Sequence, residues 1–480
     1  MIEANLGEDG TAVGANPANP ATGDLTKGPI LRTLLVFSIP MLLSNVLQTL
    51  NGSINAIWVG RLLGESALGA TANATMVMFL LFAAIFGFGM ATTVRVGQFF
   101  GAGDLDAARR TFGAGVGLCA IMAATAGAAG WFLAEGLLHL LSTPAASYAE
   151  ALAYLRVILV TVPFGTVSMM VSMGLRGAGD SKTPLNAMYL TVALDIVLNP
   201  LLIIGLGPIP GLGIAGSALA SAVANFAGVV LMVATIYRKD LPLRLRGAEL
   251  RYLLPAGPEL RYVLGKGLPM GAQMLIMSAA GVVMIGLVNR EGLNAAAAYG
   301  ASLQVWNYLQ MPAMAIAAAV SAIVAQSIGA GNHARVGEAT RMGLLTNLVM
   351  TSALVVVVVL FDRPLLSLFL GGTSPALPIA THIQLVTAWS FVVMGMMMIL
   401  SGTMRAYGVV VVPLIIMSVA MYPGRIGFYT LAYPVIGAEA VWWAAPVGTV
   451  ISSAMTTLYY LTGRWRPSEP VVSAQPVPAE

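Results

Sequence analysis

The chain has 480 residues, of which 58% are hydrophobic and only 9% charged, whereas a soluble domain carries about a quarter charged residues, so most of its surface must face lipid. The net charge of +4 comes from basic residues dispersed over the predicted loops, which excludes an extended nucleic-acid-binding surface. The single cysteine, Cys119, excludes an intramolecular disulfide and a cysteine-based metal site.

Twelve apolar segments follow one another along the chain, each long enough to cross a membrane as a helix, which takes about 20 residues. Polar residues before and after them predict disordered tails at 1–30 and 464–480. The connections after the third and ninth segments contain short amphipathic stretches. The sequence therefore predicts an all-α integral membrane protein with the spans 33–59, 66–94, 108–133, 151–177, 183–205, 213–237, 262–288, 295–325, 339–361, 379–404, 409–431 and 437–461.

The basic residues of the predicted loops are distributed unevenly between the two sides of the membrane. Nineteen of the 24 Lys and Arg residues fall on the side of the two termini. Because cytoplasmic loops are enriched in Lys and Arg, we expect both termini to be cytoplasmic in a multi-pass plasma-membrane protein. The five on the opposite side are Arg61, Arg156, Arg290, Arg363 and Arg425.

The two halves of the chain repeat one another. The pairs Pro40 and Pro269, Arg61 and Arg290, and Arg176 and Arg405 are each separated by 229 residues, and Gly101-Ala102-Gly103 recurs as Gly329-Ala330-Gly331 after 228. Each half has six predicted spans, so both halves have the same orientation in the membrane. Parallel repeats are related by an axis along the membrane normal, with the substrate path between them. The predicted units are two six-helix lobes, 31–238 and 262–463, joined by a cytoplasmic linker, 239–261.

Polar side chains recur along the first predicted span. Asn45, Gln48 and Asn55 share one face of this helix, and Asn73 of the second span can join them. We expect this face to line a cavity, although hydrogen bonding between helices is the alternative.

One acidic residue, Asp195, lies deep inside a predicted span, whereas the other 19 of the 20 lie in tails, loops or span ends. A carboxylate is costly in lipid and should face a protein cavity. A carboxyl that alternates between charged and neutral forms is the simplest proton carrier, and with neighbouring oxygens it could instead bind Na⁺. Asn199 lies one turn further on the same face, and Asn55 is a third candidate. A purely structural role for Asp195 as a hydrogen-bond acceptor stays open.

The C-terminal half offers side chains suited to a pocket for varied organic compounds. Flexible thioethers adapt to different apolar shapes, and aromatic rings bind organic cations. Ordinary helix packing explains the methionines equally well. The candidates are Met274, Met277, Gln304, Trp306, Asn307, Tyr308 and Met394.

The chain resembles the multidrug and toxic compound extrusion (MATE) family over nearly all of 30–463. The resemblance is carried by an ordered set of short motifs: Ile39-Pro40, Asn55-Ala56-Ile57-Trp58-Val59-Gly60, Gly101-Ala102-Gly103-Asp104, Leu175-Arg176-Gly177-Ala178-Gly179-Asp180, Leu198-Asn199-Pro200-Leu201, Gly213-Ile214-Ala215-Gly216-Ser217-Ala218 and Lys266-Gly267-Leu268-Pro269. It implies a monomeric exporter of small cationic drugs and dyes from the lipid membrane, driven by H⁺ or Na⁺ and needing no cofactor.

The chain departs from the family at the coupling positions. The resemblance places acids at the positions of Asn55 and Asn199 and an Asn at that of Asp195, so the remaining carboxyl is moved by about one turn. Another branch of the family carries acids where this chain has Met277 and Met394. The resemblance therefore favours coupling in the N-terminal lobe, as in the DinF-like branch.

Three other functions compete with this interpretation. A flippase for lipid-linked oligosaccharides would need a basic central cavity, and we expect no Arg or Lys at mid-helix depth. An enzyme would need paired acids, a nucleophile with its base, or a metal cluster, and the three scattered histidines provide none. A channel would show a pore motif, which the duplicated spans do not contain.

Overall fold

The computed structural model describes residues 24–140, 145–206 and 209–466. The first half of the chain forms α1 (Ile30–Leu63), α2 (Glu65–Gly101), α3 (Leu105–Leu140), α4 (Ala145–Gly177), α5 (Lys182–Ile204), β1 (Gly205–Leu206), β2 (Ile209–Pro210) and α6 (Ile214–Arg238). The second half forms η1 (Gly247–Leu253), α7 (Gly257–Arg290), α8 (Leu293–Gly329), α9 (His333–Leu360), α10 (Asp362–Leu370), α11 (Leu377–Thr387), α12 (Ser390–Ala406), α13 (Val411–Val419), η2 (Ala420–Ile426), α14 (Gly427–Ile436) and α15 (Glu439–Leu461).

Long apolar helices account for almost the whole described chain, because a helix satisfies its backbone hydrogen bonds internally where lipid offers no partner. Nine helices of the described part are long and apolar enough to cross a membrane, and the pair α11–α12, bent by 43°, makes a tenth. Helices α2 and α15 lie alongside them, which gives the twelve predicted spans. The short hairpin β1–β2 is the one pair of strands in the described ranges.

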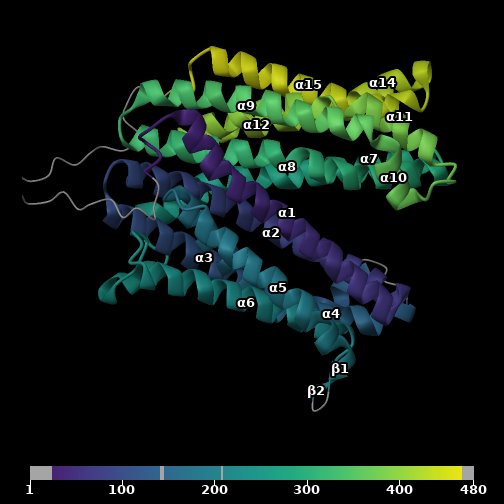
Figure 1. Ribbon diagram of the computed structural model, residues 1–480, viewed down its shortest axis with the longest axis horizontal. Coiled ribbons are helices and arrows are strands. Elements are labelled where there is room, and N and C mark those ends of the chain that lie inside the picture. The colour runs from purple at the N-terminus through teal and green to yellow at the C-terminus, as the bar shows by residue number, and fades with distance from the viewer. Residues whose placement is uncertain (1–23, 141–144, 207–208, 467–480) are drawn as a thin grey trace, which may run out of the picture.

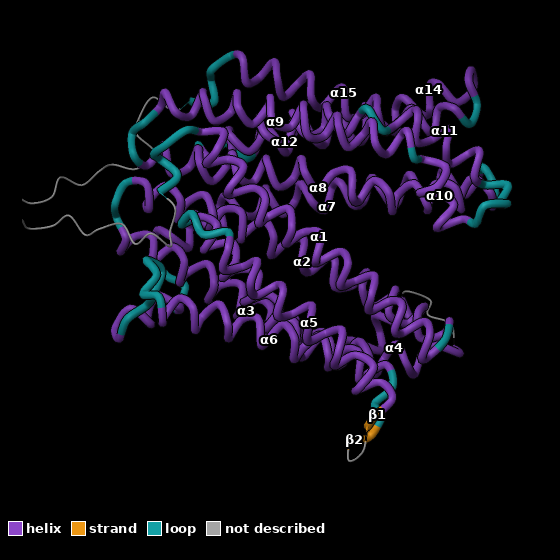
Figure 2. Tube along the Cα trace, viewed as in Figure 1, coloured by secondary structure: helices purple, strands orange, loops and turns teal. Residues whose placement is uncertain are grey.

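The helices form two lobes that correspond to the two halves of the chain. Figure 1 shows α1–α6 in purple and teal and α7–α15 in green and yellow. The lobes pack together at the end where the described chain begins and ends, which we call the closed end. They diverge toward the end where α10, α14 and the β-hairpin lie, which we call the splayed end (Figure 2).

Repeated hydrogen bonds confirm the duplication in three dimensions. Asp104 accepts a bond from the Ala107 amide at the start of α3 (2.9 Å), and Asn332 accepts the corresponding bond at the start of α9 (3.1 Å). Thr93 donates to the Met173 carbonyl (2.9 Å) inside one lobe, and Ser321 donates to the Gly402 carbonyl (3.3 Å) inside the other. Equivalent residues in the two lobes are 228 or 229 positions apart in each of these bonds.

Helix α1 begins in the opposite lobe. Leu34, Phe37 and Met41 are buried in a cluster made mostly of α8, α9 and α12 side chains. Residues 24–29, which precede α1 and were assigned to the tail, are described, and Leu25 is buried in the same cluster. The rest of that tail, 1–23, lies outside the described residues.

The linker lies against the N-terminal lobe. Its helical turn η1 packs on α3 so closely that a Cβ at Gly117 would lie 1.8 Å from the Leu253 carbonyl oxygen. Arg109 of α3 also forms an ion pair with Glu249 (3.1 Å). Helix α7 then begins at Gly257, several residues before its predicted start.

The expectation that no basic residue lies at mid-helix depth is wrong. Arg425 falls in the middle of the eleventh span, 411–436, within the π-helical segment η2. Its Cβ lies beside Gly448 of α15, and its side chain lies close to Tyr299 of α8. The prediction failed because a lone arginine next to Pro423 and Gly424 looks like a span end, whereas the π-helical segment continues the helix through it.

Candidate cation site

Asp195 of α5 lies inside the N-terminal lobe and is shielded from lipid. Its side chain is 1% exposed, and Asn199, one turn further along α5, is 0% exposed. Ser221 of α6 donates a hydrogen bond to Asp195 Oδ1 (2.9 Å). The side chains of Asn199 and of Asn51 from α1 also lie close to the carboxylate. The acid is therefore solvated by neutral polar groups from three helices.

A second group of bonds adjoins the first and centres on Asn55 of α1. Its Oδ1 accepts bonds from Ser217 of α6 (2.7 Å) and from Asn199 Nδ2 (3.3 Å). The buried Tyr154 of α4 also lies close to the Asn55 side chain. Helices α1, α4, α5 and α6 thus converge on one polar cluster, in which Asn199 joins the Asp195 and Asn55 groups.

The cluster has spare oxygen atoms. In the described part of the chain, Asn199 Oδ1 and Asn51 Oδ1 are buried without a hydrogen-bond partner. None of the ion pairs between described residues involves Asp195. A buried carboxylate without a cationic partner is unfavourable, and oxygen ligands are those that Na⁺ prefers. The arrangement fits either a proton on Asp195 or a bound Na⁺.

A cavity of about 310 Å³ adjoins this cluster between α2, α4 and α6. Ser221, the residue that donates to Asp195, is part of its wall, together with Thr161 and Asn225. Most of the remaining wall is apolar. Asp195 is therefore one hydrogen bond away from a space that could hold water or a small ligand.

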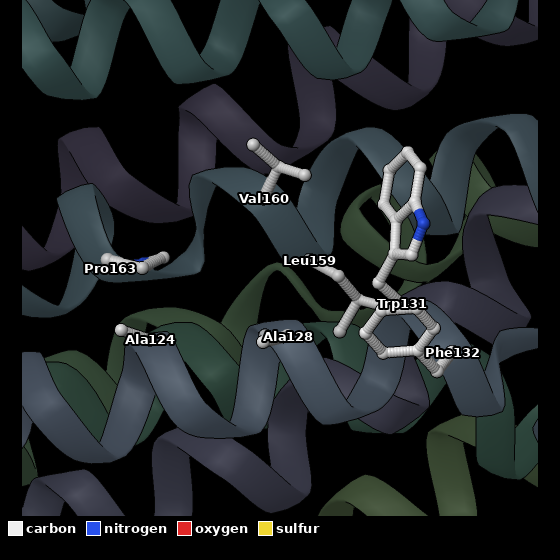
Figure 3. A pocket seen from close by; sticks show the side chains of 8 residues that line it. Ala124, Ala128, Trp131, Phe132, Leu159, Val160 and Pro163 are labelled. Atoms are coloured by element: carbon white, nitrogen blue, oxygen red, sulfur yellow. The ribbon is translucent and has the colours of Figure 1, made fainter.

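A cavity of about 360 Å³ between α3 and α4 has a different character. Its wall is apolar, and Figure 3 shows Trp131 and Phe132 at one end and Pro163 at the other. Phe132 is 85% exposed, as expected of a lipid-facing side chain. This cavity contains no candidate residue from the sequence and offers no group for binding an ion.

The structure places Asp195, Asn199 and Asn55 in one cluster, and none of the predicted cavity residues that the structure describes lines either of the two cavities above. Trp306 is buried, donates to Gln384 (3.0 Å) and packs edge-on against Tyr299. The side chain of Asn73 lies outside the described residues. Gln48, Met277, Gln304 and Asn307 are exposed, and the half-buried candidates are Asn45, Met274, Tyr308 and Met394.

Sequence reasoning missed Tyr154, Ser217 and Ser221. Ser217 and Ser221 are four residues apart on α6, so both face α5, and this spacing was the available signal. Serine is common in membrane helices, however, and only the packing of α6 on α5 singles these two out. Tyr154 lies in an amphipathic stretch that the sequence does not orient.

A family model described as MatE matches residues 40–201 and again residues 269–430, once in each lobe. The chain belongs to the MatE family. A Bacillus subtilis relative, "Probable multidrug resistance protein YoeA", is 31% identical over 437 residues, covering 91% of this chain and 94% of its own. A Shewanella oneidensis relative named "FAD transporter" is 27% identical and covers 80% of this chain and 84% of its own.

Solved structures of MatE transporters have the same fold. The structure described as the "Outward-facing conformation of a multidrug resistance MATE family transporter of the MOP superfamily" matches with a TM-score of 0.84. It is 22% identical and covers 92% of this chain and 97% of its own. The two-lobe architecture predicted from the duplication is therefore that of the MatE family, and the chain is a multi-pass membrane protein of this family.

Proposed function

We propose that this MatE protein exports amphipathic organic cations in exchange for H⁺ or Na⁺ by alternating access. The observation that carries the proposal is the buried Asp195 carboxylate, surrounded by neutral oxygens and free of any ion pair among the described residues. Such a group requires a small cation when the site is closed to water, and releases it when the site is hydrated.

Exposed amides support a substrate path between the lobes. Gln48 of α1 and Gln304 and Asn307 of α8 are exposed although they lie within membrane-spanning helices. Amide side chains are costly against lipid and are favoured where they meet water or a polar ligand. Adaptable apolar surface along this path would come from Met274, Met277 and Met394.

We assign the closed end to the cytoplasm from the excess of Lys and Arg on the side of the termini. The splayed end then faces outward, so the arrangement corresponds to the stage at which cargo leaves and the coupling cation enters. The name of the Bacillus subtilis relative, a probable multidrug resistance protein, supports drugs and dyes as the cargo.

The test is dye export by the purified protein in proteoliposomes under an imposed pH or Na⁺ gradient. We expect the wild-type protein to move a cationic dye against its gradient with one of the two ions, and Asp195→Asn to abolish this coupled movement. The matched control is Asp362→Asn at the half-buried start of α10, which should export at the wild-type rate. Coupled export by Asp195→Asn at the wild-type rate would contradict the assignment.

Anionic cargo is the second candidate, and it is favoured by Arg425, a guanidinium inside a membrane span, and by the relative named for FAD transport. The same proteoliposomes can be loaded with FAD or with a lipid-linked pyrophosphate sugar, the cargo of the flippase alternative. Movement of either compound without movement of cationic dyes would replace the first candidate.

A further inference from the structure

Two glutamines bridge the lobes at the closed end. Gln98 of α2 donates through Nε2 to the Ala406 carbonyl at the end of α12 (2.7 Å). Gln326 of α8 donates through Nε2 to the Gly177 carbonyl at the end of α4 (3.0 Å). Each bond thus connects a helix of one lobe to the last turn of a helix in the other lobe, and both glutamines are 0% exposed.

The two bridges are related by the internal duplication. Gln326 follows Gln98 by 228 residues, and Ala406 follows Gly177 by 229. The backbones also meet reciprocally, since a Cβ at Gly101 would lie 2.0 Å from the Gln326 carbonyl oxygen and one at Gly329 would lie 1.8 Å from that of Gln98. Glycine at both positions allows α2 and α8 to approach closely enough for the bridges to form.

A different group orients each glutamine amide. Arg95 donates to Gln98 Oε1 (3.1 Å), which leaves the Nε2 group facing Ala406. The Arg95 Nε atom lies 3.9 Å from Oε2 of Glu259 in α7. The Arg95 guanidinium also packs over the Tyr262 ring, with Cζ 4.6 Å from the ring centroid. The first bridge is therefore oriented by an arginine that also contacts the opposite lobe.

The N-terminal segment orients the second bridge. The Leu25 amide donates to Gln326 Oε1 (3.2 Å). Arg335 of α9 holds this segment by donating to three of its carbonyls, those of Leu25 (3.1 Å), Lys27 (2.9 Å) and Gly28 (2.9 Å). At 9% exposed, Arg335 is itself buried.

We propose that Gln98 and Gln326 are the paired latches that hold the closed end shut during transport, and that Arg335 is a positioning residue that sets the Gln326 latch through the segment 25–28. The proposal rests on the proposed function only in taking the lobes to separate here at another stage of the cycle. Separation of the lobes breaks both bonds and leaves the Gly177 and Ala406 carbonyls to be hydrated. The latches therefore favour the closed arrangement until the candidate cation site in the N-terminal lobe changes state.

The test measures how often the closed end opens, with no drug and no ion gradient present. In a Cys119→Ala background, Val94→Cys places a thiol at a 1% exposed position where α2 packs on the C-terminal lobe. Loss of both buried hydrogen bonds is expected to raise the alkylation rate of this thiol about tenfold in Gln98→Leu/Gln326→Leu. Gln310→Leu, which removes a glutamine that bonds Asn307 of its own helix and no other residue among those described, is the matched control and should leave the rate unchanged.

A reference thiol separates opening from unfolding. Val59→Cys lies in the core of the N-terminal lobe at 1% exposed, and its alkylation rate should be the same in every variant. If the double Leu variant does not fold, Gln98→Asn/Gln326→Asn replaces it, because the shorter amide cannot span the same distance. An unchanged rate at Val94→Cys, or an equal rise at Val59→Cys, would overturn the proposal.

Arg335→Gln tests the positioning role. It should raise the alkylation rate in combination with Gln98→Leu, because each change weakens a different latch, and should add nothing to Gln326→Leu, because both act on the same one. An equal added effect in the two combinations would overturn the role of Arg335. Since the readout needs no cargo, the latches can be supported even where dye export fails, and dye export can succeed where the latches fail.

Discussion

At the scale of single residues, the proposed cation site depends on where one carboxyl lies on α5. Asp195 and Asn199 are one turn apart, both are buried, and the Asn199 side chain reaches both Asp195 and Asn55. A carboxyl at position 199 would therefore remain within the same polar cluster. We expect Asp195→Asn/Asn199→Asp to recover part of the coupled dye export that Asp195→Asn loses, measured in proteoliposomes under the same gradient. A swapped variant as inactive as the single one would show that the position of the charge, and not only its presence, sets coupling.

At the scale of helices, the start of α5 depends on Asp180. Its carboxylate accepts bonds from the backbone amides of Lys182 (2.9 Å) and Thr183 (3.0 Å) and from the Thr183 hydroxyl (2.6 Å). Loss of a cap at a helix N-terminus costs about 0.5–2 kcal/mol, so Asp180→Ala should lower the thermal unfolding midpoint in detergent. Asp180→Asn retains an accepting oxygen and should remain near the wild-type midpoint. Equal midpoints for Asp180→Ala and the wild-type protein would show that water replaces the cap.

The linker shows a pH-sensitive contact at the same scale. Asp240, exposed between α6 and η1, hydrogen-bonds Arg246 and Arg244, and these bonds hold its pKa below the ordinary value. Because the folded-state pKa is depressed, the contact contributes at pH values above the ordinary pKa and is lost as the pH falls through the depressed one. Acidification into that range should therefore release this turn.

At the scale of the whole molecule, the lobes also pack closely where α2 meets α7. A Cβ at Gly87 would lie 2.3 Å from both the Gly267 carbonyl oxygen and the Gly271 amide nitrogen. Gly87→Val should therefore force the lobes apart at the closed end. In a Cys119→Ala background, the distance between spin labels placed at Arg238 of α6 and Arg341 of α9 should then increase. Gly281→Val, at a helical α7 glycine with open space around it, is the control. An unchanged distance in Gly87→Val would show that the helices absorb the side chain by sliding.

The sequence predicts the spans and the duplication because lipid imposes a long apolar run on every crossing and because repeated landmarks keep their spacing. It also singles out the acid and two amides that the structure places in the candidate cation site, since Asp195 is conspicuous among apolar neighbours. It does not predict the contributions of Ser217, Ser221 and Tyr154, because these depend on which helices pack together. Arg425 was misplaced for a related reason, since a π-helical segment leaves no clear mark in composition.

The packing of the start of α1 against the opposite lobe has a consequence for folding during synthesis. The segment at Leu25 and the first turns of α1 are buried against α8 and α9, which leave the ribosome some 300 residues later. Until then α1 lacks its neighbours in α8 and α9, so the newly inserted first half of the chain has an uncovered flank. The N-terminal segment can therefore reach its final position only after the second half of the chain has been inserted. A chain that ends before Arg335 would lack the side chain that binds the carbonyls of segment 25–28.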